Sequence, residues 1–581
     1  MVNKSSISSL TKIGVIVVLL VLSGLILQSC SNPPALNPEE PYWLDNDKKP
    51  IPEPNYKEPN LMWMTIKRTS FDQLNEILDI DRDIRKIAGN MTKAKNVNSL
   101  DEVPNSSWFT NRHGYPTTRM TPEEIETGLA LTPGPDTTNI WHVFRPKTGG
   151  TTPGFWIEDS RGDQYIIKFD PPGNPEMATA AAAMGSRYLY ACGYNVTQET
   201  IVYWRPEMLR IREGATIKDK DGKKRPLTME DINDILIKVQ FESDGQIRSL
   251  ASLNIGNVKG PFIYDGTRRG DPNDWCPHQH RRDLRGLYVI GSLINHYDLK
   301  DHNSMDVYIG EDGDGYLKHY QMDFGSTFGS DGRRPKPVRK GYANYFDLKD
   351  VMINVATLGL KTWPWQYAKL YKYPSIGYFE SELFEPNEFD PIFPNPAFEQ
   401  KTMQDNYWGA KIVMAFSDDD LKALIRSGYL SNNDAEDYLF KTLKQRQAKI
   451  GRYWFGRINP LDYPYLKKGD KNWELHFDDL SVKYGIEKNN ALYHYDIRIN
   501  GKELFGLQQT TDPIILLESD IMKYVSNNSK NILLGDEKGF LFEIFIKTKR
   551  EQTDLSSSTI FKIWCNEQLE LYKIVGIEHP N

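Results

Sequence analysis

Two short polar segments of the chain contain the residue types that phosphoryl transfer requires. They are residues 296–303 (HYDLKDHN) and, about twenty residues later, residues 322–325 (MDFG). Phosphoryl transfer needs a carboxylate that accepts the proton of the attacking hydroxyl, oxygen ligands that hold Mg²⁺ against the phosphates, and a cation near the transferred group. The residues that fit these needs are the base Asp298, the cation Lys300, and the metal ligands Asn303 and Asp323.

The elements expected around these segments are of two kinds. From about residue 141 to 262 the pattern favours strands, with a hairpin turn at 161–163 between the apolar runs 155–157 and 165–169. An apolar helix is expected over 283–297, directly before the first polar segment, and further helices over 405–455. The polar segments are therefore expected to follow a buried helix, at the junction of a strand-rich and a helical region.

At these residues the sequence resembles the protein-kinase-like superfamily. Residues 296–303 match the catalytic loop H-R-D-L-K-x-x-N with Tyr297 in place of arginine, and 322–325 contain the D-F-G metal motif. The resemblance spans roughly 141–460. It is closest to the atypical branches, namely HipA-type bacterial kinases, phosphoinositide kinases and secretory-pathway kinases. It implies an α+β, two-lobed fold.

The resemblance also implies a nucleotide site upstream. Lys168 closes a strand, as the phosphate-binding lysine of kinases does, and Glu176 opens the next helix, where kinases keep the glutamate that pairs with this lysine. The glycines of the preceding turn, expected to cover the phosphates, are Gly149, Gly150 and Gly154. The implied cofactors are ATP and Mg²⁺ or Mn²⁺.

The N-terminus has the layout of a bacterial export signal. Lys4 and Lys12 precede an apolar run of 15 residues, 13–27, which is short for a spanning helix of about 20. The run ends in LQSC, which resembles the lipobox in which the cysteine, here Cys30, becomes lipidated. The expected location is the cell envelope, with the chain anchored to a membrane, in the outer membrane facing the periplasm or the cell surface. An uncleaved anchor helix is the alternative.

Composition and charge limit the remaining possibilities. The chain has 581 residues, 39% hydrophobic and 26% charged, with a formal net charge of -7. This composition is globular, and an acidic chain without a basic tail argues against nucleic acid as a partner. The expected domains are a signal peptide (1–29), a proline-rich tether (30–60), a helical extension (61–140), a small lobe (141–262), a large lobe (263–460) and a C-terminal β-sandwich-like domain (473–581).

Two functions follow from these observations. The first is a membrane-anchored phosphotransferase that moves the γ-phosphoryl of ATP to a hydroxyl-bearing or protein substrate. The second is a kinase-shaped binding or scaffold lipoprotein without turnover, since ATP is not normally supplied outside the cytoplasm. A weaker alternative places the main function in the β domain. The sequence does not identify the phosphate acceptor.

Overall fold

The computed structural model describes most of the chain after residue 44. The described ranges are 45–87, 91–114, 118–147, 152–219, 221–499, 501–504, 506–529, 532–534, 537–551 and 554–580. The predicted signal peptide, Cys30, and the turn residues Gly149 and Gly150 lie outside them. Within the described residues no helix is both long and apolar enough to cross a membrane.

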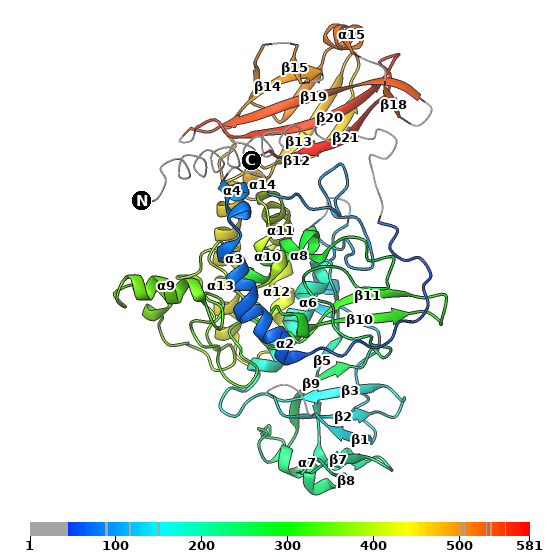
Figure 1. The fold of residues 1–581 in the computed structure, drawn as a ribbon, viewed down its shortest axis with the longest axis vertical. Coiled ribbons are helices and arrows are strands. Elements are labelled where there is room, and N and C mark those ends of the chain that lie inside the picture. The colour runs from blue at the N-terminus through cyan, green and yellow to red at the C-terminus, as the bar shows by residue number, and fades with distance from the viewer. Residues whose placement is uncertain are drawn as a thin grey trace, which may run out of the picture.

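Three bodies are stacked along the long axis of the molecule (Figure 1). A strand-rich small lobe lies at the bottom of the view, a helical large lobe in the middle and a β domain at the top. Each has its own buried apolar cluster. The α+β architecture with two lobes and a C-terminal β domain, expected from the sequence, is confirmed.

The small lobe is a six-stranded sheet in the order β5-β9-β3-β2-β1-β6. Its strands are β1 (Trp141–Pro146), β2 (Gly154–Glu158), β3 (Gln164–Lys168), β5 (Glu199–Trp204), β6 (Leu209–Ile211) and β9 (Ile247–Leu253). Alternate side chains of β2 and β3 are buried, as the period of two requires. The other elements of the lobe are β7 (Thr216–Lys218), β8 (Lys224–Pro226), α7 (Met229–Leu236) and the 3₁₀ turn η2 (Pro206–Met208). Helix α6 (Met177–Ala191) follows β3 and buries its apolar residues in the core of the large lobe.

The large lobe is built around helix α8 (Arg282–Leu293), all of whose residues are buried. It packs against α11 (Met403–Ala415) at Gly286, where an added Cβ would lie 2.5 Å from the Trp408 ring. The remaining helices are α5 (Pro122–Thr127), α9 (Leu348–Ala356), α10 (Pro396–Glu399), α12 (Asp418–Arg426) and α13 (Asn433–Phe455). Short 3₁₀ turns are η3 (His278–His280), η4 (Asp301–Asn303) and η5 (Pro364–Tyr367).

A β-hairpin joins the two polar segments that the sequence analysis identified. Strand β10 (Ser304–Ile309) pairs with β11 (Tyr316–Gln321), and β11 also pairs with the short β4 (Asn195–Val196). The register sets Ser304 opposite Gln321, so the residues just outside the hairpin meet, and the Met322 N–H donates to the Asn303 carbonyl over 3.0 Å. The hairpin therefore brings the two polar segments next to each other in space, although about twenty residues separate them in the sequence.

An N-terminal arm lies along the large lobe. It consists of α2 (Leu61–Ile66), the π-helical turn η1 (Lys67–Phe71), α3 (Asp72–Leu78) and α4 (Ile80–Ile87), drawn in blue in Figure 1. The chain then runs into the core, where the buried Trp108 ring stacks on His319 with centroids 3.6 Å apart. The segment 61–140 is therefore helical only in part.

The C-terminal domain is two packed sheets that share one apolar core. The small sheet holds β12 (Leu461–Lys468), β13 (Trp473–Asp479) and β17 (Ile514–Leu517). The large sheet holds β14 (Leu492–Ile499), β15 (Lys502–Glu503), β16 (Gln508–Thr510), β18 (Ile532–Leu534), β19 (Glu537–Lys549), β20 (Ser558–Asn566) and β21 (Tyr572–Glu578), with α14 (Leu480–Lys483) and α15 (Ser519–Asn528) alongside. The expected start at 473 is too late, because β12 already pairs with β13.

Candidate active site

The loop after α8 holds Asp298 in a fixed orientation. The Asn303 side chain donates through Nδ2 to both the Asp298 carbonyl, over 2.8 Å, and Asp298 Oδ2, over 2.9 Å. Lys300 Nζ lies 2.8 Å from Asp298 Oδ1. Because Nδ2 is used in this way, the Asn303 amide keeps Oδ1 as its ligand atom. The predicted base, cation and first metal ligand are therefore in mutual contact.

The Asp298 carboxylate is adapted to accepting a proton. Burial raises its pKa above the ordinary value, and the charge of Asp323 acts in the same direction, while Lys300 and Asn303 oppose the rise. A general base works best when its pKa lies nearer the working pH than that of a free carboxylate. The loop thus keeps one carboxylate partly desolvated beside a cation that holds it in place.

Asp323 lies directly after the hairpin, in a left-handed backbone conformation with φ of 61°. A non-glycine residue in this region costs on the order of 1 kcal/mol, and such conformations cluster at functional sites. Asp323 lines the same cavities as Lys168 and Lys300. The predicted second metal ligand is therefore brought to the predicted site.

The buried His296 side chain supports the loop through its contact with Phe324. Its ring is buried and meets Phe324 edge to face, with centroids 6.0 Å apart. Burial lowers the pKa of His296 to about 4, and Lys300 lowers it further, while Asp323 opposes the shift. The histidine is therefore neutral at ordinary pH, and it contacts the aromatic residue that follows Asp323.

Two adjoining cavities, which share four lining residues, occupy the cleft between the lobes. The larger, of about 750 Å³, is lined by apolar side chains such as Trp156, Ile255 and Met322 and reaches Asn303. The smaller, of about 250 Å³, contains Asp298. The residues that line both are Lys147, Lys168, Lys300 and Asp323. The charged groups therefore lie where a mainly apolar cavity meets one with a mixed polar and apolar lining.

Lys168 is held between two carboxylates from different parts of the fold. Burial acts to lower its pKa, but the charges of Glu199 and Asp323 outweigh burial and raise it. Glu199 begins β5, and its Oε1 accepts hydrogen bonds from Ser252 Oγ over 2.5 Å and Thr197 Oγ1 over 2.8 Å. Its Oε2 is buried without a hydrogen-bond partner among the described residues. Glu199 therefore supplies, within the same cavity, the negative charge near Lys168 that the sequence led us to expect from Glu176.

Glu176 does not pair with Lys168, so that prediction is wrong. Its carboxylate instead accepts the backbone N–H of Ser431, at 3.2 Å and 3.1 Å for the two oxygens. Glu176 caps α6 in a left-handed conformation, with φ of 68°, which directs it away from the strand. The order of the kinase motifs predicted that the carboxylate near Lys168 would come from the start of α6. In the structure it comes from Glu199, at the start of strand β5.

Lys147 is a site residue that the sequence analysis missed. It follows β1, its Nζ donates to the Thr152 carbonyl over 2.9 Å, and it lines both cavities. Burial lowers its pKa, as does the charge of Lys168, while Asp323 opposes the shift. Gly154 accepts the Lys147 N–H over 2.9 Å, and a Cβ there would lie 2.3 Å from the Ile167 carbonyl oxygen. The expected glycine therefore positions Lys147 beside Lys168.

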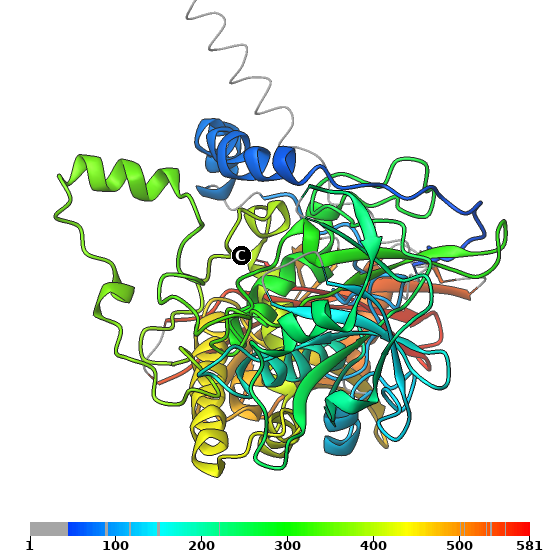
Figure 2. The same ribbon diagram turned by 90° about the horizontal axis from the view of Figure 1, so that it is seen from below.

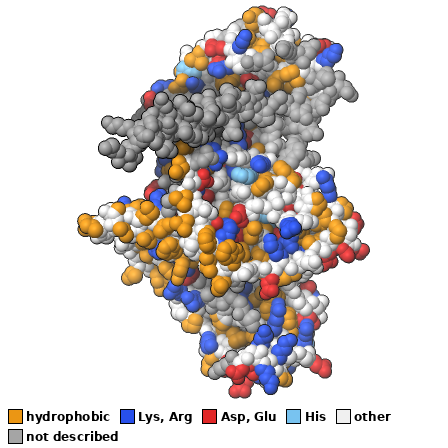
Figure 3. All heavy atoms as spheres, viewed as in Figure 1, with side chains coloured by type: hydrophobic (Ala, Val, Ile, Leu, Met, Phe, Trp, Pro, Cys, Tyr) orange, Lys and Arg blue, Asp and Glu red, His pale blue; other side chains and the backbone are white. Residues whose placement is uncertain are grey.

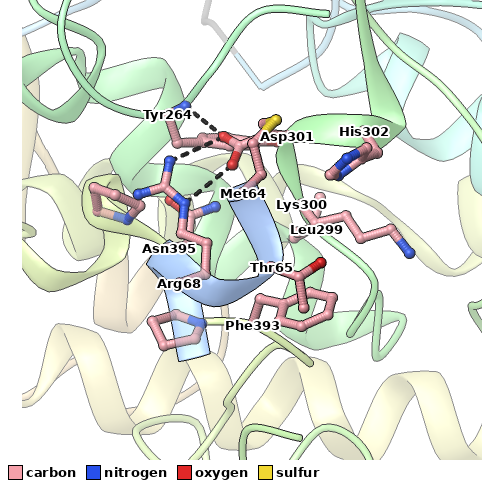
Figure 4. Close-up of a pocket in the computed structure, with 12 residues that line it drawn as sticks. Met64, Thr65, Arg68, Tyr264, Leu299, Lys300, Asp301, His302, Phe393 and Asn395 are labelled. Carbon is pink, nitrogen blue, oxygen red and sulfur yellow. Dashed lines mark hydrogen bonds and ion pairs between the residues drawn. The ribbon is translucent and has the colours of Figure 1, made fainter. Parts of the chain in front are cut away.

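The N-terminal arm contacts the 296–303 loop through Arg68 (Figure 4). The Arg68 guanidinium donates to both Asp301 oxygens, at 3.0 Å and 3.2 Å, and also to Asp72 and Asp265. Asp301 Oδ1 also accepts the Tyr264 N–H over 2.8 Å. Burial opposes the charge on Arg68, but the carboxylates outweigh it and raise its pKa. The side chain of Lys300 extends away from this pair.

A metal would be held here by few protein ligands. The described residues contain no group of three or more His, Cys, Asp or Glu side chains placed to hold a metal ion. Mg²⁺ in nucleotide sites needs only one or two protein ligands, because phosphate oxygens and water complete its shell. Asp323 and Asn303 are a set of this kind, with hard oxygen donors only.

Comparisons with known proteins return kinases among solved structures. No protein-family model and no curated protein matches the chain. The chain is similar to a Helicobacter pylori proinflammatory kinase, CtkA, with 10% identity and a TM-score of 0.29 over 54% of this chain and 93% of that chain. It is also similar to the Golgi casein kinase, with 11% identity and a TM-score of 0.25 over 70% of this chain and 93% of that chain. For the same kinase with Mn/ADP bound, the values are 10%, 0.25, 70% and 94%. At such low TM-scores the roles of residues rest on the side-chain geometry of this chain.

Proposed function

We propose that the chain is a kinase-like phosphotransferase that moves the γ-phosphoryl of ATP to a hydroxyl group. The observation that carries this proposal is the convergence of Asp298, Asp323 and Lys168 on one cleft from three separate segments. Each has the chemical type and the surroundings that its role requires. Chance turn residues would have no reason to line one cavity, as these three line the smaller one.

The large-lobe residues would perform the proton transfer. Asp298 accepts the proton of the attacking hydroxyl, and its raised pKa strengthens it as a base. Lys300, 2.8 Å from that carboxylate, holds it in place and places positive charge where negative charge develops on the transferred group. Asn303 fixes the carboxylate by hydrogen bonds to its backbone and its side chain. The acceptor hydroxyl is expected in the smaller cavity, where Asp298 lies.

The small-lobe residues would bind the nucleotide. The apolar part of the larger cavity, which includes Trp156 and Ile255, suits a base, and its volume of about 750 Å³ accommodates a nucleotide. Lys147 and Lys168 provide positive charge at the junction of the cavities, where phosphates would lie. Mg²⁺ or Mn²⁺ held by Asp323 and Asn303 would supply charge neutralisation for those phosphates.

We further propose that the protein is a lipoprotein of the bacterial cell envelope, anchored through Cys30. Support comes from the lysine-flanked apolar run and the lipobox-like residues before the cysteine. Intact-mass measurement of the native protein should show loss of residues 1–29 and a diacylglyceryl adduct. A mature chain that retains Met1 contradicts this part of the proposal and leaves the phosphotransferase untouched.

The phosphotransferase is tested by titrating the purified full chain with ATP in Mg²⁺ or Mn²⁺ and following release or self-transfer of γ-phosphate. Wild type should bind nucleotide only with metal present and turn it over. Asp314→Asn, a change in the exposed turn of the β10–β11 hairpin, serves as the matched control. Binding without turnover favours the scaffold alternative, and absence of binding with either metal refutes the site.

A further inference from the structure

A long apolar segment projects from the large lobe away from the cleft. We call residues 345–372 the α9 protrusion, since α9 lies near its start, and Figure 2 shows it standing clear of the body. No residue of α9 is buried, although this helix is largely apolar. Beyond it Leu358, Leu360 and Leu370 are 88%, 83% and 95% exposed. Single exposed leucines are ordinary, but a contiguous patch marks a binding surface.

The N-terminal arm continues this surface. Gln73 of α3 joins the two, because its Oε1 accepts the Leu348 N–H over 2.8 Å and its Nε2 donates to the Phe346 carbonyl. Figure 3 shows hydrophobic side chains gathered over both elements on one face. The exposed apolar residues of the arm are Met62, Trp63, Ile66, Phe71, Leu74, Leu78, Ile80 and Ile84.

The composition of the protrusion is that of a membrane interface. Trp363 and Trp365 stack with centroids 5.0 Å apart, and the Lys361 ammonium lies 5.5 Å from the Trp363 ring centroid. Tryptophan and tyrosine favour the headgroup level of a bilayer, and lysine stems extend past them to the charged surface. The protrusion carries four lysines (349, 361, 369 and 372) against two aspartates (347 and 350), which suits anionic lipid.

The shape of this surface also favours a bilayer over a folded partner. The apolar side chains lie on a helix and flanking loops that project from the body in Figure 2, and hydrophobic side chains gather there on the face drawn in Figure 3. A protein partner with the packing of a specific interface would need a matching concave surface, whereas lipid adapts to any contour. The three leucines of the protrusion, which are more than four-fifths exposed, share it with aromatic rings and lysines, the residue types that a bilayer interface combines.

We propose that the α9 protrusion and the exposed faces of α2, α3 and α4 form a membrane-docking surface that inserts its leucine and valine side chains into an anionic bilayer. This surface is separate from the lipid anchor proposed at Cys30, and it does not depend on phosphotransfer. It fixes the orientation of the folded body on the membrane, whereas a tether alone leaves that orientation free.

The test uses the full chain reconstituted into vesicles of phosphatidylethanolamine and phosphatidylglycerol that contain spin-labelled lipid. Single cysteines at Leu358→Cys or Leu370→Cys carry a fluorescent label, since Cys192, Cys276 and Cys565 are buried and the thiol of Cys30 is taken up by the proposed lipid anchor. The matched control is Ile237→Cys, whose side chain is 83% exposed at the far end of the small lobe. We expect lipid quenching at positions 358 and 370 to exceed that at 237 by about twofold or more.

Two results would overturn the proposal. The first is equal quenching at positions 358, 370 and 237, because the N-terminal anchor alone brings all three equally near the membrane. The second is a change in label emission without lipid that grows with protein concentration, which would assign the surface to a second copy of the chain. Lys349→Glu with Lys361→Glu should reduce quenching at 358, and unchanged quenching would remove the role of anionic lipid. Both lysines are exposed, so the folded state should be retained.

Discussion

The two sides of the cleft hold their charged residues by different means. On the large-lobe side, Asp298, Lys300 and Asn303 belong to one loop and bond to each other. On the small-lobe side, Lys168 ends a strand and meets Glu199 from another strand, without a direct hydrogen bond between them. The first side is a preformed unit, whereas on the second side the charged groups lie near each other and Glu199 bonds to other residues, Ser252 and Thr197. A site for a phosphate-bearing ligand would have this asymmetry, since the ligand itself completes the second side.

The largest loss of activity should follow removal of the proposed base, Asp298, from the large-lobe side. Asp298→Asn keeps the side-chain shape and a hydrogen bond but cannot accept a proton, so phosphoryl transfer should fall by roughly 10²–10⁴-fold. Nucleotide affinity should stay near wild type, because Asp298 lines only the smaller cavity. Parallel measurement of nucleotide binding and γ-phosphate release checks both. Equal turnover by wild type and Asp298→Asn would remove Asp298 from the chemistry.

The next largest effect should come from breaking the ion pair between Arg68 and Asp301, which supports the loop on the large-lobe side. Arg68→Gln leaves the Asp301 carboxylate buried with fewer partners, and breaking a buried ion pair costs about 3–5 kcal/mol of stability. If Arg68 positions the loop, the turnover rate should fall while nucleotide affinity is kept, and Arg68→Lys should restore part of it. A purely structural role predicts that binding and turnover decline together with the folded fraction, which thermal unfolding measures.

The site residues of the 298–303 loop could be predicted from the sequence, whereas some of those from distant segments could not, and the reason is physical. Asp298, Lys300 and Asn303 lie within six positions, and fixed spacing in one loop carries geometric information. Asp323 was predictable as well, because only the hairpin between the motifs had to close. Glu199 and Arg68 reach the site from distant segments, and single acidic or basic residues give no local signal. The glycine-rich turn indicated a phosphate loop, and a lysine directly before it was the available hint for Lys147.

The same distinction applies to the fold. Apolar periodicity identified α8, which is buried along its whole length, and α13, of which only part of the surface is buried. The start of the β domain was placed too late because β12 mixes polar and apolar residues around Pro464, in the run LDYPYLKK, and only its first two residues are buried. The arm and the α9 protrusion expose apolar residues that a pattern assigns to a core. Periodicity reports which side chains are apolar, and only the tertiary structure shows whether they are covered.

Because His296 is buried as a neutral ring, the stability of the fold should depend on pH. The pKa of His296 is about 4 in the folded chain and 6.5 ordinarily, so the folded state disfavours its protonation. The contribution of the neutral ring is present above pH 6.5 and is lost as pH falls toward about 4, by about 3 kcal/mol at most. His296→Phe should flatten the decline in unfolding temperature across this window. His142→Phe, on an exposed strand position, is the control and should leave the decline unchanged.

A substitution on the small-lobe side of the cleft should have a smaller effect, which falls on nucleotide affinity rather than on turnover. Glu199→Gln removes a charge that raises the pKa of Lys168, so the lysine should be less well held and nucleotide affinity should fall by about tenfold. Glu176→Gln is the matched change, since its carboxylate contacts only the Ser431 N–H among the hydrogen bonds described for it. Calorimetric titration with metal and ATP compares the two. A larger loss in Glu176→Gln would restore the pairing expected from the sequence.

The smallest expected effect is a displacement of the pH profile, and it joins the two sides of the cleft. Lys300 lowers the pKa of Asp298, whereas burial and Asp323 raise it. Lys300→Met therefore raises the pKa of the base, and since the base must be deprotonated to act, the acidic limb of the turnover profile should move to higher pH. Lys340→Met is the control, because Lys340 lines the same small cavity but pairs with Asp331 at 2.6 Å. A lower rate with an unmoved acidic limb in Lys300→Met would mean that the lysine acts on the transferred group and that another residue sets the charge of Asp298.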